Sequence, residues 1–219
     1  MTCKHFNIMK IPYIPDLEAL GFEELELAME TGAAKSYIGC VNWPQEFPYR
    51  PDVSFSIARS GSCIAVLYHV RGLDLRAAAM EDNGPVWEDS CCEFFVAHPS
   101  DGTYFNFELN CAGTLLASKR TSRENAVLFT AGQLSRIKRF GTAERKLTEE
   151  NGRIFRWSAG LCIPMDLIGL DPERLPASIR ANFYKCADKS AHPHFLSWNP
   201  VLTPSPDFHR PEFFGELYF

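Results

Sequence analysis

The strongest constraint on the fold is the segment 104–110, in which polar and apolar side chains alternate. In an extended strand, successive side chains point to opposite faces, so Phe105, Phe107 and Leu109 share one face. The other face carries Tyr104, Asn106, Glu108 and Asn110. The first face therefore belongs in a hydrophobic core. The second is either a surface for hydrogen bonding or the solvated side of an edge strand, which is the commoner explanation of such alternation.

Most of the chain from residue 36 onward consists of similar short runs, rich in β-branched and aromatic residues and separated by turn formers. The segments 59–62 and 111–113 have the composition of hairpin turns. This pattern predicts an all-β fold, an antiparallel β-sandwich of jelly-roll or immunoglobulin-like type with short peripheral helices. The predicted strands lie near 36–42, 53–59, 62–71, 91–98, 103–110, 113–119, 125–130, 136–141, 153–163, 179–187 and 212–219.

Helix formers occur mainly near the start of the chain, at 16–20 and 22–29, with Gly21 between the two runs. A further single helical turn is predicted at 164–170, because Pro164 suits a first helical turn and Gly169 suits its end. We interpret residues 1–219 as one domain, in which residues 1–35 form an N-terminal extension packed on the sandwich.

Charge and composition narrow the class of partner. The net charge is -5 and the basic residues are scattered, which argues against a nucleic-acid surface. No run of about 18 apolar residues is present, so we expect no membrane partner. The first residues lack the apolar core of a signal peptide, which predicts a cytoplasmic protein as written, or a secreted or periplasmic one if a signal was removed. Six of the eight cysteines are dispersed, and Cys91 and Cys92 are adjacent on a predicted strand. All are then expected to be reduced and mostly buried.

Two tryptophans stand at loop junctions. Trp87 follows the turn sequence Asn83-Gly84-Pro85, and Trp198 precedes a proline-rich loop at 199–211. Each could be a core residue, because tryptophan is usually well buried. At a rim, however, an indole can stack on the apolar faces of a pyranose while nearby amides and carboxylates bond its hydroxyls. The pair is therefore a candidate sugar platform.

A carboxylate, Glu93, shares a strand face with Cys91 and Phe95. It must reach water or a partner, because an unpaired buried charge is costly, so it is either an acceptor in a groove or half of an ion pair. Asn182 and Tyr184 form a polar stripe on another strand, and the stripes make one patch if the strands are neighbours.

These residues resemble carbohydrate-binding module family 9, within a DOMON-like superfamily, over about 36–219. The most specific motifs are 86–95 and 213–219. The resemblance implies an antiparallel β-sandwich, often appended to xylanases, that clamps the terminal sugar of a glucan or xylan between two tryptophans. By position, Trp87 and Trp198 would be that clamp and Glu93 its hydroxyl-binding carboxylate. The remaining candidate ligand-binding residues are Asn106, Glu108, Asn110, Asn182 and Tyr184.

The resulting hypothesis is non-catalytic binding of a mono- or oligosaccharide of the xylan or cellulose type, in association with polysaccharide catabolism. One alternative is a glycoside hydrolase, or an accessory protein of polysaccharide breakdown, that uses Glu93 and Glu108. A second is a structural or interaction sandwich with no open sugar site. No catalytic residue, metal ligand or cofactor is assigned, apart from the option of a structural calcium ion. The oligomeric state is not determined by the sequence.

Overall fold

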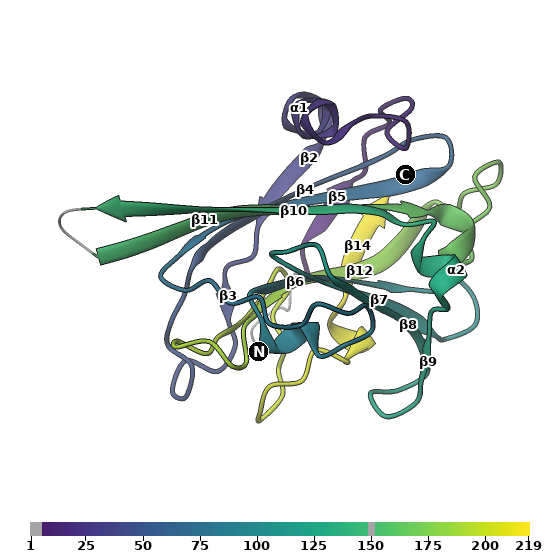
Figure 1. Ribbon diagram of the computed structural model, residues 1–219. Coiled ribbons are helices and arrows are strands. Elements are labelled where there is room, and N and C mark those ends of the chain that lie inside the picture. Colours follow the sequence, from purple (N-terminus) through teal and green to yellow (C-terminus); the bar gives the residue numbers. More distant parts are fainter. Residues whose placement is uncertain (1–5, 149–151) are drawn as a thin grey trace.

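The computed structural model describes residues 6–148 and 152–219, and in this part of the chain two β-sheets face each other (Figure 1). The central path of the first sheet is β1 (Ile8–Lys10), β14 (Gly215–Tyr218), β12 (Ser178–Cys186), β6 (Cys91–Ala97), β7 (Tyr104–Asn110), β8 (Leu115–Arg120) and β9 (Ala126–Leu128). Beside β12 it adds β13 (Phe195–Ser197) and then β3 (Cys40–Val41). The second sheet contains β10 (Lys138–Thr148), β11 (Gly152–Pro164), β5 (Cys63–Gly72), β4 (Asp52–Arg59) and β2 (Ala34–Tyr37). The predicted all-β sandwich is confirmed.

Neighbouring strands are antiparallel, except that β1 runs parallel to β14. The two predicted hairpin turns join β4 to β5 and β7 to β8. In the second of these turns Gly113 has φ +87°, a backbone conformation that favours glycine. A Cβ atom at this position would lie 3.2 Å from the backbone nitrogen of Gly141. The glycine therefore sets both the turn and its close approach to β10.

The inward faces of both sheets form the main core. Phe105, Phe107 and Leu109 all lie in it, as the alternation along 104–110 predicts. Across the interface, Phe55 of β4 stacks on Phe183 of β12, with ring centroids 3.8 Å apart. The side chains that alternate with these residues on β6, β7 and β12 consequently point away from the second sheet.

The N-terminal helix α1 (Phe22–Gly32) covers the outer face of the second sheet (Figure 1). Its buried residues Leu25 and Met29 pack with Ala65 and Leu67 of β5. Gly21 is the N-cap residue, and its N–H donates to the Glu24 carboxylate at 2.7 Å. The predicted helix at 22–29 is confirmed, whereas 16–20 forms turns instead of a helix.

The other helical elements are short. They are η1 (Val86–Glu88), α2 (Ala131–Leu134), η2 (Met165–Ile168) and η3 (Pro211–Phe213). The predicted turn at 164–170 corresponds to η2, which begins after Pro164 and ends at Gly169 with φ +74°. No helix within 6–148 and 152–219 is long and apolar enough to cross a membrane.

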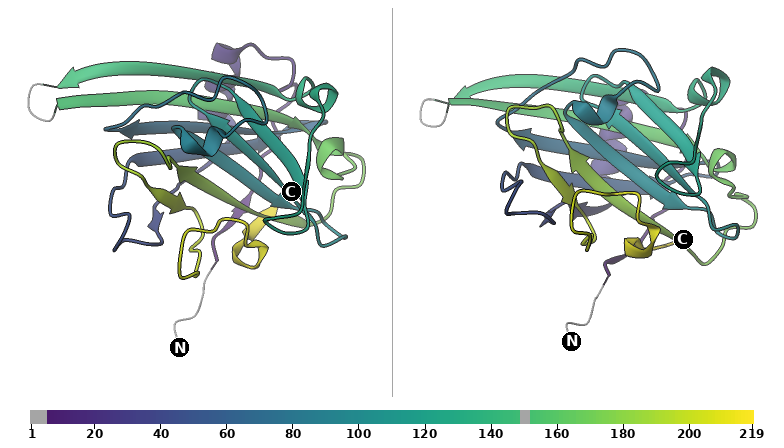
Figure 2. Two further views of the ribbon diagram at one scale, coloured as in Figure 1. Left: turned by 60° about the horizontal axis from the view of Figure 1, so that its bottom comes forward. Right: turned by 90° about the horizontal axis from the view of Figure 1, so that it is seen from below.

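The structure differs from the prediction along two segments. The expected strand at 36–42 is split, because the chain passes from β2 in the second sheet to β3 in the first. The hairpin of β10 and β11 is longer than expected and extends beyond the rest of the sandwich (Figures 1 and 2). Continuous pairing of the two strands satisfies the backbone along this extension, which side-chain periodicity does not report.

Candidate functional site

A pocket of about 320 Å³ opens on the outer face of the first sheet. Its floor comes from β6, β7 and the end of β12, and loops close its sides. Ligand pockets in proteins span about 300 to 1,000 Å³, so this one suits a ligand of one or two small rings. The pocket is lined by Trp87, Glu93, Glu108, Arg120, Arg123, Cys186, Asp188, Phe195, Pro206, Asp207, Phe208 and His209.

Two carboxylates occupy the floor. Glu93 of β6 and Glu108 of β7 are direct cross-strand partners, and their side chains are only 3% and 4% exposed. The Cys186 thiol of β12 donates to Glu93 Oε1 at 2.9 Å. Like charges at directly opposed strand positions repel, and burial of a carboxylate is also unfavourable. The paired Glu93 and Glu108 therefore lower the stability of the folded state.

Glu108 is held by its neighbour on the same strand face. Asn106 Nδ2 donates to Glu108 Oε1 at 2.8 Å, and Asn106 Oδ1 accepts from Arg120 Nε at 2.9 Å and from the Ser118 hydroxyl. The other oxygen, Glu108 Oε2, is buried and has no hydrogen-bond partner in the part of the chain that the structure describes. Asn106 therefore orients the carboxylate from beneath and leaves one oxygen available in the pocket.

Burial determines the protonation state of Glu93 and Glu108 on the pocket floor. It raises the pKa of Glu93 well above its ordinary value, and the neighbouring Glu108 raises it further. Burial also raises the pKa of Glu108 to about 7, against the opposing effects of the Asn106 hydrogen bond and the Arg120 charge. Near pH 7 the pair consequently retains at least one proton, which gives the floor both a hydrogen-bond donor and acceptors.

Trp87 forms one wall from within η1 and is 39% exposed. Its carbonyl accepts from the Asp188 N–H at 3.2 Å, which ties this segment to the loop after β12. The buried Asp89 carboxylate accepts from the backbone N–H groups of Ala78 and Ala79 and pairs with Arg76 at 3.2 Å. These contacts fix the position of the exposed indole.

A second aromatic wall comes from residues that the sequence did not single out, Phe195 and Phe208. The Phe208 ring stacks on Tyr184 at 4.1 Å, and the Tyr184 hydroxyl donates to the Phe208 carbonyl at 3.2 Å. Tyr184 is fully buried beneath this ring, so it supports the wall without lining the pocket.

Charged groups of the β8–β9 loop, of the loop after β12 and of the C-terminal loop complete the rim. Arg123 pairs with Asp207 at 3.6 Å, and burial raises the pKa of Asp188 to about 6. Burial lowers the pKa of His209 to about 3, so this imidazole is neutral at pH 7. Its Nδ1 lies 3.1 Å from the Tyr104 hydroxyl. None of these loop residues carries a local pattern that could have marked it, because each reaches the pocket only through the packing of distant loops.

Trp198 does not lie in the pocket, so Trp87 and Trp198 do not form the expected sugar clamp. It is 3% exposed, and its ring meets Phe183 and Phe55 edge-on at 5.5 and 5.8 Å. Its Nε1 donates to the Ser36 hydroxyl of the second sheet at 3.1 Å. Alternation explains the difference, because Leu196 and Trp198 share the inward face, whereas Phe195 faces the pocket.

Asn110 and Asn182 are also outside the pocket, contrary to expectation. Asn110 Oδ1 accepts from the backbone N–H groups of Ala112 and Thr114 and so stabilises the β7–β8 turn. Asn182 Oδ1 accepts from the Asn199 N–H at 2.9 Å and anchors the C-terminal loop. Both side chains satisfy buried backbone groups, which removes them from contact with a ligand.

The fold and the pocket together define a β-sandwich with a ligand-sized site on the outer face of its first sheet. The chain matches the model of carbohydrate-binding family 9 over residues 23–219, and it belongs to that family. No curated protein matches the chain.

Solved structures resemble the whole chain. A protein from Bacteroides uniformis ATCC 8492, proposed to bind carbohydrate, is 34% identical with a TM-score of 0.82 over 97% of this chain and 98% of that chain. A family 9 module from Caldicellulosiruptor kristjanssonii in complex with glucose is 12% identical with a TM-score of 0.56, over 97% and 95%. The same kind of module with cellotriose is 12% identical with a TM-score of 0.53, over 97% and 93%. At 12% identity, the similarity to the two Caldicellulosiruptor modules concerns the fold alone.

Proposed function

We propose that this protein binds carbohydrate without cleaving it, and that the pocket between Trp87 and Phe208 receives the terminal unit of a mono- or oligosaccharide. The observation that carries the proposal is the exposed Trp87 indole beside the buried pair Glu93 and Glu108. A pyranose needs both an apolar platform and a set of hydroxyl-binding groups. Membership of carbohydrate-binding family 9 and the glucose and cellotriose complexes of structural neighbours support the same ligand class.

Each group has a chemical role in the proposal. The Trp87 indole stacks on a sugar face, and Phe208 offers a second apolar surface. Glu108 Oε2, which has no hydrogen-bond partner among residues 6–148 and 152–219, accepts from a sugar hydroxyl. Arg120 lies beside this floor and donates to a hydroxyl or ring oxygen. The ligand class is a glucan or xylan type of oligosaccharide, with glucose as the simplest probe.

Tryptophan fluorescence gives the first test. Of the four tryptophans, Trp87 is 39% exposed, whereas Trp43, Trp157 and Trp198 are 7%, 4% and 3% exposed. Acrylamide should therefore quench mainly Trp87, and glucose, xylose, cellobiose or xylobiose should protect it. Trp87→Ala should weaken sugar binding at least tenfold, about 1.4 kcal/mol. Full affinity in Trp87→Ala, or no response to any of the four sugars, would count against the proposal.

The matched control is Glu88→Gln, which changes the residue next to Trp87. Glu88 does not line this pocket and pairs with Lys189 at 2.8 Å on the surface. Surface ion pairs contribute little, so this variant should fold and bind sugar as the wild type does. A loss of affinity equal to that of Trp87→Ala would indicate a disturbed segment instead of a lost platform.

A glycoside hydrolase is the second candidate, and the pairing of Glu93 with Glu108 is the observation that favours it. Directly opposed strand residues have Cβ atoms about 4.5 to 5.5 Å apart, which is close to the carboxyl spacing of retaining enzymes. Both groups, however, lie side by side on one floor, and hydrolases place them on either side of the scissile bond. Release of a chromophore from an aryl glycoside, abolished by Glu93→Gln, would reverse the order of the two candidates.

A further inference from the structure

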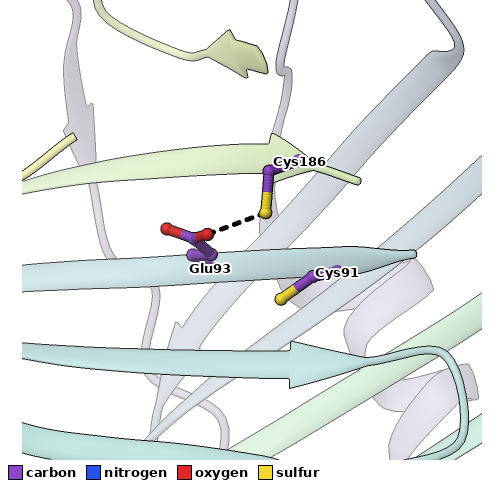
Figure 3. Close-up of side chains that lie close together, drawn as sticks. All are labelled: Cys91, Glu93 and Cys186. Atoms are coloured by element: carbon purple, nitrogen blue, oxygen red, sulfur yellow. Dashed lines mark hydrogen bonds between the residues drawn. The ribbon is translucent and has the colours of Figure 1, made fainter. Parts of the chain in front are cut away.

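A cluster of two thiols and one carboxylate lies at the end of the pocket floor. Cys91 and Glu93 are two residues apart on β6, so they share the outer face, and Cys186 of β12 is the direct cross-strand partner of Cys91. Figure 3 shows the Cys186 thiol and the Glu93 carboxylate facing each other, with the Cys91 thiol beside them. One ligand atom from each residue lies within 4.8 Å of the other two.

The three side chains of the cluster are buried, and weak hydrogen bonds offset the loss of their hydration only in part. The Cys186 thiol donates to Glu93 at 2.9 Å and lies 3.5 Å from the Trp87 carbonyl, whereas the Cys91 thiol contacts the Cys186 thiol and lies 3.7 Å from the carbonyl of the next residue. Thiols are weak hydrogen-bond donors, and a buried carboxylate ordinarily requires stronger partners. Isolated buried thiols need no ligand, but two thiols and a carboxylate that converge on one point form a donor set.

Glu108 provides a second, independent observation. It lies directly opposite Glu93 and is 4% exposed. Its Oε2 has no hydrogen-bond partner among the described residues, although Glu108 lines the pocket. Unpartnered buried polar atoms are rare in proteins and call for an explanation such as an ion. Glu108 is not one of the three residues whose ligand atoms lie within 4.8 Å of one another, so it marks the side of the cluster that faces the pocket.

We propose that Cys91, Glu93 and Cys186 bind a divalent metal ion of borderline softness, Zn²⁺ foremost, with the fourth position towards Glu108 and the pocket. Sulfur ligands lie about 2.3 Å and carboxylate oxygens about 2.0 to 2.2 Å from Zn²⁺, so tetrahedral ligands are about 3.3 to 3.8 Å apart. The Cys186 Sγ–Glu93 Oε1 separation of 2.9 Å would lengthen slightly, and side-chain rotations would bring the other two separations, which are at most 4.8 Å, into this range. The two thiols, and the Glu93 carboxyl group where it is protonated, release their protons to solvent on binding, and the thiolates select against Ca²⁺ and Mg²⁺.

The site goes beyond sugar binding and does not depend on it. One Glu93 oxygen would bind the metal and the other would remain in the pocket, so metal would alter sugar affinity without being required for the fold. Local sequence gives no sign of this site, because Cys91 and Cys186 are far apart in the chain and no metal-binding spacing joins them.

Cobalt spectroscopy tests the proposal directly. The full chain, reduced and stripped of metal under nitrogen in the absence of sugar, is titrated with Co²⁺ and then with Zn²⁺. We expect one Co²⁺ per chain, thiolate-to-cobalt charge-transfer absorption in the near ultraviolet, and displacement by Zn²⁺. Wild-type protein that binds no Co²⁺, or binds it without this absorption, would overturn the proposal.

Variants assign the ligands. Cys91→Ser and Cys186→Ser should each weaken Zn²⁺ binding at least tenfold and reduce the charge-transfer band by about half, because each removes one of two thiolates. Cys111→Ser is the matched control. Cys111 is equally buried, but its thiol donates to the Arg76 carbonyl at 3.4 Å, a bond that a hydroxyl can also make. An unchanged cobalt spectrum in Cys91→Ser would contradict the assignment.

Thermal unfolding covers the case in which a cysteine variant does not fold. Zn²⁺ that binds the folded wild type should raise its Tm, whereas Mg²⁺ should not. No rise in Tm at Zn²⁺ concentrations that saturate the protein would refute the site. A Cys91–Cys186 disulfide in the purified chain, with no metal binding after its reduction, would also refute it. Glucose titration of the metal-stripped protein reports separately on the proposed function.

Discussion

Trp198→Phe separates a clamp residue from a core residue. Trp198 lies between the sheets, edge-on to Phe55 and Phe183, and its Nε1 donates to the Ser36 hydroxyl on the opposite sheet. Phenylalanine retains an aromatic ring at this position but lacks both the N–H group and part of the indole volume. We expect lower stability and unchanged sugar affinity.

The magnitude follows from two losses. The hydrogen bond to Ser36 contributes about 1 kcal/mol. The lost ring atoms and the resulting cavity cost about 1 to 2 kcal/mol more. The free energy of unfolding should therefore fall by about 2 to 3 kcal/mol. For a chain of this length each kcal/mol lowers the Tm by about 2 to 4 °C, which gives a decrease of about 4 to 12 °C.

Urea unfolding and sugar titration measure the two effects on the same variant. Ser36→Ala is the matched control, because it removes the hydrogen bond and leaves the indole in place, and it should cost only about 1 kcal/mol. Wild-type stability in Trp198→Phe together with a tenfold loss of sugar affinity would refute the placement of Trp198 in the core. Equal costs in both variants would show that packing of the indole contributes little.

Three further perturbations probe the turns, the titrating groups and the Trp87 wall. Gly113→Ala should destabilise the protein more than Gly102→Ala in chemical unfolding. Both glycines have positive φ, but only a Cβ atom at 113 would lie against backbone atoms of another strand, at Gly141. Equal losses of stability in the two variants would contradict the close approach of the turn to β10. Burial lowers the pKa of His194 to about 3, below the unfolded value of 6.5. The contribution of the neutral imidazole to folding stability is therefore fully present above pH 6.5 and is lost as the pH falls towards 3. Stability measured across this window should fall by about 1.4 kcal/mol per pH unit from this group, and His194→Phe should reduce the slope by that amount, whereas an unchanged slope would argue against the assignment. Asp89→Asn removes the negative charge that binds the loop before Trp87. Hydrogen exchange in that loop should therefore accelerate, and sugar affinity should fall. Wild-type protection from exchange in this variant would show that the carboxylate is dispensable.

Much of the fold could be predicted from local patterns. The alternation in 104–110 identified Phe105, Phe107 and Leu109 as core residues, and the two hairpin turns lie where glycine and polar residues cluster. Side-chain period and turn chemistry are local properties, so the sequence displays them directly. The start of α1 after Gly21 is predictable for the same reason.

The candidate site was only partly predictable. Trp87, Glu93 and Glu108 do meet in one pocket, but Trp198 faces the core and Phe208 takes part in the opposite wall. A shift of one residue reverses the face on which a strand side chain lies, and a short strand such as β13 contains too few residues to fix that face from its pattern.

The sequence by itself determined that this chain forms a β-sandwich, that one face of 104–110 is buried, and that Trp87 follows a turn. Only the tertiary structure decided which distant residues share the pocket. Strand pairing placed Glu93 opposite Glu108 and Cys91 opposite Cys186, and it pointed Trp198 inward towards Ser36. The physical reason is that alternation fixes the face of each strand, whereas the partners across that face are set by the register and packing of strands far apart in the chain.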